Sequence, residues 1–217
     1  MFITFEGIDG SGKTTQLKLL AETLRNKGFD VLETKEPGGT QLGQIISEIL
    51  LNPDHTQLAS PAEMLLFIAD RIQHLHEVIT PALEEGKTVL CDRYHHSTLA
   101  YQGGGRQIDL NWLHSIENRF IIIPDLTFLL NISVEESKRR TKNKSECRME
   151  DEDKLFFGRV IKAYAQLQSA YPHRIINIQA EDKVGFIHNK VLRCALAKIE
   201  KEHMYKKEEQ RIKILMK

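Results

Sequence analysis

The stretch from Gly7 to Thr14 carries the residue types that bind a polyphosphate. Its letters, GIDGSGKT, fit the pattern G-x-x-x-x-G-K-[ST] at every position. In this pattern the glycines let successive backbone N–H groups point at one anion, the lysine reaches the β- and γ-phosphates, and the hydroxyl ligates Mg²⁺. The candidate nucleotide-binding residues are those of the whole loop: Gly7, Ile8, Asp9, Gly10, Ser11, Gly12, Lys13 and Thr14.

The segments on both sides of this phosphate loop fit the same interpretation. Residues 2–5 are mostly apolar and predict a strand, while Leu17, Leu20 and Leu24 recur at helical spacing and Gly28 is placed to end the helix. A helix that starts at the loop would direct its positive N-terminal end at the bound anion. A glycine-rich turn without a ligand is the structural alternative.

A pair of charged residues, Asp92 and Arg93, lies at the end of another apolar strand. Residues 86–94 predict a strand that ends at Asp92, and Arg93 comes directly after it. In phosphate-loop enzymes a carboxylate at this place supports Mg²⁺ and its waters, so Thr14 and Asp92 are the candidate metal residues. Arg93 would then lie beside the transferred phosphate. An ordinary salt bridge at the strand end is the alternative.

Strands and helices alternate along the chain, which predicts an α/β fold with a parallel sheet. The helix expected over residues 60–79 starts with Ser60 as N-cap and Glu63 as its capping-box partner. Ligands of such sheets bind beyond the carboxyl ends of the strands, which places Glu36 and Pro37 near the phosphate loop. The five expected strands are residues 2–5, 30–34, 86–94, 124–132 and 174–179.

Two further groups of residues have open interpretations. Phe67 and Arg71 are four residues apart and share a helical face, where they could contact a base; spacing alone favours a core ring and a salt bridge. Residues 138–150 are strongly basic and lack apolar anchors from Thr141 to Met149, which is typical of a mobile lid. A solvated charged face is the plain alternative for that run.

The composition favours one domain over residues 1–217 and excludes some partners. The formal net charge is zero and the isoelectric point is about 7.1, so no global basic field indicates nucleic acid or an anionic membrane. No stretch reaches transmembrane length, and Cys91, Cys147 and Cys194 show no paired spacing, so we expect reduced thiols and a cytoplasmic protein. Residues 203–217 predict a charged helical extension.

The chain as a whole resembles the thymidylate kinase family of phosphate-loop nucleoside monophosphate kinases. The matching blocks are FEGIDGSGKTTQ, KEPGGT, LLFIADRIQH, DRYHHSTLAYQGGGR and LTFLL, followed by a basic lid that ends in CRMED. The resemblance implies a three-layer P-loop NTPase fold, with a five-stranded parallel sheet flanked by helices. It also implies ATP and dTMP as substrates, Mg²⁺, ADP and dTDP as products, and a homodimer.

The resemblance assigns roles to single positions. Phe67 resembles the ring that stacks on thymine, and Arg71 the guanidinium that bonds the carbonyl edge of the base. Arg93 resembles the arginine that holds the acceptor phosphate, and Asp9 the carboxylate near the sugar 3′-hydroxyl. The full set of dTMP-binding candidates is Phe67, Arg71, Arg93, Thr98, Tyr101, Gln102, Glu36 and Pro37.

The catalytic arginine of this family stands either in the phosphate loop or in the lid. Gly10 follows Asp9 in the loop, so the resemblance points to the lid, with Arg139, Arg140 and Arg148 as candidates. We expect the catalytic residues to be Lys13, Arg93 and Asp9, together with Arg140 or Arg148 from the lid. Lys35 and the pair Cys147-Arg148 depart from the family pattern of Arg and Asp-Arg.

Two other functions compete with this one. A kinase for another nucleotide or a small hydroxyl substrate would retain the phosphate loop, and a hydroxyl acceptor would need a base such as Asp9. A nucleotide-binding switch would need a guanine motif Asn-Lys-x-Asp. The nearest match, residues 143–146, ends in Glu146.

Overall fold

Parallel strands form one sheet in the order β2-β3-β1-β4-β5. The structure is a computed structural model that describes residues 1–142, 148–149 and 152–215, with side chains described through residue 202 and at Met204. Within these residues the sheet has five strands, as the sequence predicts. Their bounds are β1 Phe2–Glu6, β2 Val31–Lys35, β3 Thr88–Asp92, β4 Leu126–Asn131 and β5 Ile175–Gln179.

The central position of β1 explains its composition. Every residue of FITFE is buried, because helices cover both faces of a parallel sheet. Thr4 pairs its hydroxyl with that of Thr127 on β4 at 2.8 Å, so this polar side chain is satisfied inside the sheet. Phe5 meets Phe128 of the same neighbour at a ring-centroid distance of 5.4 Å. The phosphate loop therefore leaves from a rigid strand.

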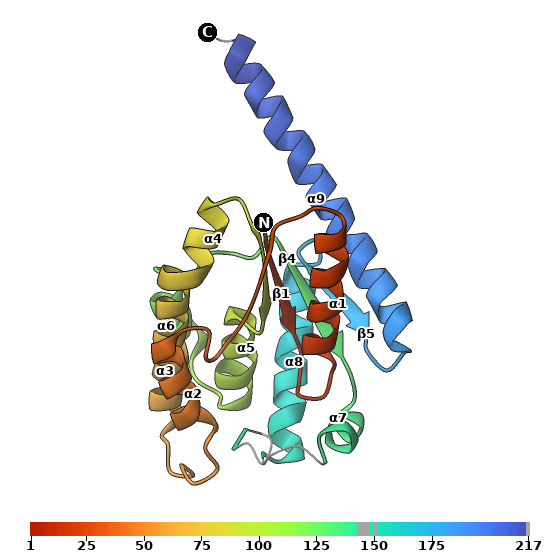
Figure 1. Cartoon of the computed structure of the whole chain (residues 1–217). Helices are drawn as coiled ribbons and strands as arrows, with labels where there is room; N and C mark the ends of the chain where they lie inside the picture. The colour runs from red at the N-terminus through yellow and green to blue at the C-terminus, as the bar shows by residue number, and fades with distance from the viewer. Residues whose placement is uncertain (143–147, 150–151, 216–217) are drawn as a thin grey trace.

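Helices cover the sheet on both faces and give a three-layer α/β fold (Figure 1). In this view α1 and α9 lie in front of the sheet and α8 lies behind it, while α9 extends well beyond the strands. The bounds are α1 Lys13–Asn26, α2 Gln41–Leu51, α3 Ser60–His74, η1 Leu75–Ile79, α4 Thr80–Glu84, α5 His95–Thr98, η2 Leu99–Gly105, α6 Leu110–Glu117, α7 Val134–Thr141, α8 Lys154–Ala170 and α9 Val184–Leu215.

The start of α3 differs from the sequence prediction. Ala59 is the N-cap and Ser60 is already helical, and no side chain caps the helix. Glu63 is buried and binds Gln102 and Arg106, so it does not turn back to the helix start. Tertiary partners outcompete the local capping box here. Beyond His74 the helix continues in a π-helical stretch, η1, before α4.

The carboxyl edge of the sheet gathers the segments that the motifs marked. The phosphate loop follows β1, Glu36 and Pro37 follow β2 with a cis bond between them, and Arg93 follows β3. Residues 138–142 and 148–149 of the predicted lid are described, and Cys147 lies outside the described residues. Of the cysteines in the described part, Cys91 and Cys194 are free thiols. No helix among the described residues is long and apolar enough to cross a membrane.

Candidate functional site

A cavity of about 510 Å³ lies at the carboxyl edge of the sheet. It joins the phosphate loop to the ends of β2 and β3 and to α3, α5, η2 and α7. Its walls are formed by Asp9, Gly10, Gly12, Lys13, Thr14, Thr15, Lys35, Glu36, Pro37, Ser47, Leu51, Phe67, Arg71, Asp92, Arg93, Tyr94, Ser97, Thr98, Tyr101, Gln102, Arg140 and Met149. The space is large enough for a nucleotide-sized ligand.

The phosphate loop has a backbone that only glycine adopts easily. Gly10 and Gly12 have φ values of 75° and 92°, and α1 begins directly after Gly12. The Lys13 ammonium donates to the Ile8 carbonyl at 3.0 Å and lies 3.9 Å from the Asp9 carboxylate. Burial lowers the pKa of Lys13 to about 8, and the nearby Arg93 adds to this effect. Lys13 is thus a buried ammonium group whose charge is not stabilised by surrounding water.

Oxygen donors for a metal lie at the mouth of the loop. The Thr14 hydroxyl donates to the Asp92 carboxylate, so the two predicted metal residues meet although they are 78 positions apart. A hydroxyl and a carboxylate are the ligand types that Mg²⁺ accepts alongside water and phosphate oxygens. The residues present therefore fit a divalent cation bound with a nucleotide.

Arg93 points from the end of β3 toward the phosphate loop. Its guanidinium pairs with Asp9 at 2.7 Å and also donates to Ser97 at 3.1 Å and Tyr101 at 3.4 Å. It also lies over the Tyr101 ring, 5.2 Å from the centroid. Burial is the largest single effect and opposes its charge, but Asp9 together with Tyr101, Tyr164 and Asp92 outweighs burial and raises the pKa of Arg93 above its usual value. Arg93 is thus a fixed cation between the two halves of the cavity.

A buried carboxylate that the sequence did not mark supports this arrangement. Glu6, at the end of β1, accepts from the Ser97 hydroxyl at 2.6 Å and from the Tyr164 hydroxyl at 2.9 Å. It also accepts from the Tyr94 backbone at 2.9 Å. Burial raises its pKa. In the sequence Glu6 is only a charged residue at the end of a mostly apolar strand, and its partners come from distant segments.

The opposite wall of the cavity contains Phe67 and Arg71 from α3. Phe67 is partly buried and Arg71 is 3% exposed. Arg71 donates through Nε to Glu36 at 2.8 Å and through Nη1 to Glu117 at 2.5 Å. Both the salt-bridge interpretation and the binding interpretation of Arg71 are therefore compatible with its place, since it also lines the cavity. Glu117, in α6, was not predicted from the sequence.

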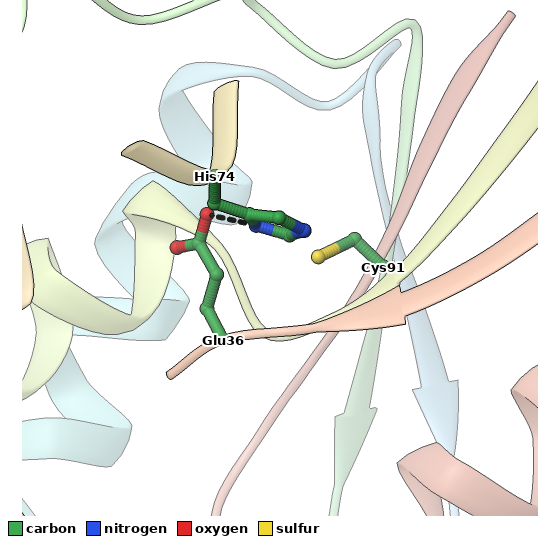
Figure 2. Close-up of side chains that lie close together, drawn as sticks. All are labelled: Glu36, His74 and Cys91. Carbon is green, nitrogen blue, oxygen red and sulfur yellow. Dashed lines mark hydrogen bonds and ion pairs between the residues drawn. The ribbon is translucent and has the colours of Figure 1, made fainter. Parts of the chain in front are cut away.

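Glu36 is itself held by a buried cluster with His74 and Cys91 (Figure 2). His74 Nδ1 and Glu36 are 3.0 Å apart, and the other ring nitrogen is 2.6 Å from the Thr34 hydroxyl. The Cys91 thiol donates to the Arg93 carbonyl at 3.0 Å, and burial raises its pKa, which keeps it protonated. The three candidate ligand atoms lie within 4.8 Å of one another, but each already has a partner. Within this cluster, His74 is the residue that holds Glu36 by a hydrogen bond.

Three predicted residues come from α5 and η2. Tyr101 lines the cavity beside Arg93, and burial raises its pKa, so its hydroxyl stays neutral. Gln102 also lines the cavity and donates to Glu63 at 2.8 Å. The Thr98 hydroxyl is buried and has no hydrogen-bond partner in the part of the chain that is described. This hydroxyl is a donor or acceptor available to a ligand.

The lid arginines lie in different environments. Arg140 lines the cavity and donates to the carbonyls of Gly10 at 3.2 Å and Ala180 at 3.1 Å. Arg139 pairs with Glu136, and its side chain is 72% exposed. Arg148 instead pairs with buried Glu63 at 2.8 Å and is not among the cavity residues. The structure therefore brings Arg140 to the phosphate loop and holds Arg148 away from it.

Comparisons with known proteins identify the family of this chain. A family model described as thymidylate kinase matches residues 5–191. A thymidylate kinase of Exiguobacterium sp. is 43% identical over 203 residues, which cover 92% of this chain and 96% of the relative. One of Pelotomaculum thermopropionicum is 45% identical over 198 residues, which cover 89% and 92%.

A solved structure adds the same result for the fold. The crystal structure of thymidylate kinase from Ehrlichia chaffeensis matches with a TM-score of 0.75 and 37% identity, and the match covers 90% of this chain and 98% of that one. The residues matched by the family model, 5–191, include the phosphate loop, the segments at the carboxyl edge of the sheet and α8. The chain therefore belongs to the thymidylate kinase family.

Proposed function

We propose that this chain transfers the γ-phosphoryl group of Mg·ATP to dTMP and releases ADP and dTDP. The observation that carries the proposal is that one cavity joins the phosphate loop to Phe67 and Arg71. Arg93 lies between these two regions. A donor phosphate and an acceptor phosphate can therefore be held side by side, as direct transfer requires.

The donor side would hold ATP through the loop from Gly7 to Thr14. Lys13 would neutralise the β- and γ-phosphates, and its charged form would be restored by the bound anion. Thr14 and Asp92 would hold Mg²⁺, which supplies positive charge to the phosphate oxygens. Arg140, which lines the cavity, would be the lid arginine that adds a further positive charge.

The acceptor side would hold dTMP through the wall opposite the loop. Phe67 would stack on the base and Arg71 would donate to its carbonyl edge, with Thr98 and Gln102 as further polar contacts. Tyr101 would lie against the sugar, and Arg93 would bind the acceptor phosphate. Glu36 and Pro37 would shape the floor of this half-site through their place after β2.

The chemistry needs no general base in this scheme. The second pKa of a phosphate monoester is about 6, so dTMP is largely dianionic at neutral pH. The obstacle is the approach of two anions, which Lys13, Arg93 and a lid arginine offset with fixed positive charges. Asp9 then serves to hold Arg93 in place and to contact the sugar.

We also propose the organisation in which this site works. Residues 1–217 form one domain, residues 138–150 act as a lid, and residues 203–217 are a helical extension. The free thiols of Cys91 and Cys194 are consistent with a cytoplasmic location. An apolar surface on α2 and α3 favours a homodimer, and its exposed side chains are Leu42, Ile45, Ile49 and Leu65.

Identification of the product tests the proposed function directly. The protein is incubated with dTMP and Mg·ATP, and the nucleotides are separated by anion-exchange chromatography. We expect dTDP and ADP in equal amounts, with no dTDP when Mg²⁺ is chelated. ADP without dTDP would indicate hydrolysis and would contradict the acceptor assignment.

A further inference from the structure

A buried carboxylate lies behind the predicted base site and is not itself among the residues that line the cavity. Glu117, the last residue of α6, is 1% exposed and accepts from Arg71 Nη1 at 2.5 Å. Arg71 belongs to the cavity wall, whereas Glu117 is not among the lining residues. Through its hydrogen bond to Arg71, Glu117 can act on a ligand in the cavity without lining it.

Arg71 is held on two sides by carboxylates from different elements. Glu36 follows β2 and accepts from Nε at 2.8 Å, while Glu117 accepts from Nη1. The guanidinium also lies over the Tyr94 ring, 5.2 Å from the centroid. A guanidinium is planar with five donors in fixed directions, so two carboxylates and a ring determine both its position and its plane.

Burying the charges of this cluster costs free energy, which a contact with a purely structural role would not need to spend. Two buried carboxylates share one guanidinium, and Glu117 Oε2 has no hydrogen-bond partner among the described residues. Burial raises the pKa of Glu117 to about 7, which records the cost of its charge. Buried ion pairs of this kind are often replaceable by apolar groups without loss of stability. A role in orienting Arg71 explains why the second carboxylate is there.

We propose that Glu117 is a positioning residue for the base site, which fixes the plane in which Arg71 donates to the carbonyl edge of the pyrimidine. The inference rests on the proposed function, because that function assigns Arg71 to the base. Thymine offers a carbonyl oxygen at this edge, whereas cytosine offers an amino group. A fixed guanidinium donor therefore favours dTMP and opposes dCMP, and Glu117 contributes to that discrimination without touching either nucleotide.

The test compares wild type with Glu117→Gln, which keeps the size of the side chain and removes its charge. Steady-state kinetics are measured with dTMP and with dCMP at saturating Mg·ATP. A hydrogen bond between charged groups contributes more free energy than a neutral one, and the difference corresponds to about tenfold in the binding constant. We expect the KM for dTMP to rise about tenfold, kcat to stay within about threefold, and the preference for dTMP over dCMP to fall.

Two controls separate positioning from folding. Asp109→Asn, at the N-cap of the same helix, removes a carboxylate that does not touch Arg71, and Asn caps as well as Asp. It should leave both KM values unchanged. In a double-mutant cycle, Glu117→Gln added to Arg71→Ala should raise the KM for dTMP no further, because the two residues act as one unit. If Glu117→Gln does not fold, Glu117→Asp takes its place in the same measurements.

The outcomes distinguish this inference from the proposed function. Wild-type turnover of dTMP together with an unchanged KM in folded Glu117→Gln would overturn the positioning role alone. A lower melting temperature with unchanged KM would assign Glu117 to stability only and would overturn it as well. Absence of dTMP turnover in wild type would overturn the proposed function, and the inference with it.

Discussion

Arg93 adopts a backbone φ of 67°, a conformation that costs a non-glycine residue free energy. Its backbone N–H is bound to the Phe5 carbonyl at 2.9 Å, so the neighbouring strand β1 holds it in place. The side chain then reaches Asp9 in the phosphate loop. This strained turn places a cation where the donor and acceptor phosphates would meet.

Replacement of Arg93 tests that placement. We expect Arg93→Ala to lower kcat by on the order of a thousandfold, the range known for arginines that neutralise a transferred phosphoryl group. Arg93→Lys should recover only part of the loss, because a lysine cannot make the paired contacts of a guanidinium. Rapid-quench or coupled assays of dTMP turnover measure both variants. Near-normal turnover of Arg93→Ala would remove this residue from the mechanism.

Lys13 couples the binding of ATP to the uptake of a proton. Since the pKa of Lys13 is lowered to about 8, about half of the free protein carries a neutral amine at pH 8. ATP phosphates, with a last pKa of about 6, are fully ionised there and favour the charged amine. The pKa of Lys13 therefore rises on binding, and the complex takes up a proton that the free protein lacks.

Calorimetry in buffers of different ionisation enthalpy measures this uptake. We expect about half a proton to be taken up per ATP bound at pH 8, and less at pH 6.5, where Lys13 is already charged. Lys13→Arg is the matched control, because a guanidinium stays charged in both states. Equal uptake by wild type and Lys13→Arg would show that the proton goes elsewhere.

At the next level of organisation, α7 closes over the phosphate loop. Ser137 donates to the Asp9 carbonyl at 2.6 Å, and Arg140 donates to the Gly10 carbonyl. Ser133 caps the helix by accepting from the Glu136 backbone. The helix that carries the basic residues is therefore attached to the loop that would hold ATP.

A matched pair of arginines tests the choice among lid residues. Arg139 and Arg140 both pair with Glu136, but only Arg140 lines the cavity. We expect Arg140→Ala to lower kcat/KM for ATP by at least about tenfold and Arg139→Ala to stay within about twofold. Arg148→Ala should affect stability through Glu63 more than turnover. A large kinetic loss in Arg148→Ala with none in Arg140→Ala would reverse the assignment.

Local sequence patterns predicted the helices and strands better than they predicted which side chains contact one another across the fold. The strands, the phosphate loop and the helix that follows it could be predicted from residue types within a few positions. The predicted cap at Ser60 was wrong, because Glu63 accepts hydrogen bonds from Gln102 and Arg106, which are about forty positions away in the sequence. The π-helical stretches η1 and η2 have no local signature in the sequence.

The same distinction holds in the site. Lys13, Thr14 and Asp92 could be predicted because motif and strand end are local features, and the topology then brings them together. Glu6 and Glu117 could not, because a carboxylate inside a strand or at a helix end acquires meaning only from its partners across the fold. Arg71 had two interpretations from spacing, and the structure gives it carboxylate partners and a place in the cavity wall.

Over the whole molecule, the exposed apolar side chains of α2 and α3 form the surface that we propose as a dimer interface. Ile68 of α3 and Leu75 of η1 are instead buried in the core. Ile45 and Leu65 are 53% and 46% exposed. Burial of such side chains between two copies would be favourable, at about 25 cal/mol for each Å² removed from water.

Light scattering at micromolar concentration tests the dimer. We expect twice the mass of 25.0 kDa for wild type and the monomer mass for the double variant Ile45→Asp/Leu65→Asp. Leu155→Asp is the control, because this side chain is 73% exposed and belongs to a different helix, α8. A monomeric wild type, or a dimer that survives the double substitution, would refute the proposed interface.

The most direct test of the account is a comparison of nucleoside monophosphates as acceptors. ADP release from Mg·ATP is followed with dTMP, dUMP, dCMP, AMP and GMP in turn, and kcat/KM is determined for each. A base site built on Phe67 and Arg71 predicts the highest kcat/KM for dTMP, with dCMP and the purine nucleotides well below it. Equal values for all five, or no stimulation by any, would contradict the assignment of the acceptor site.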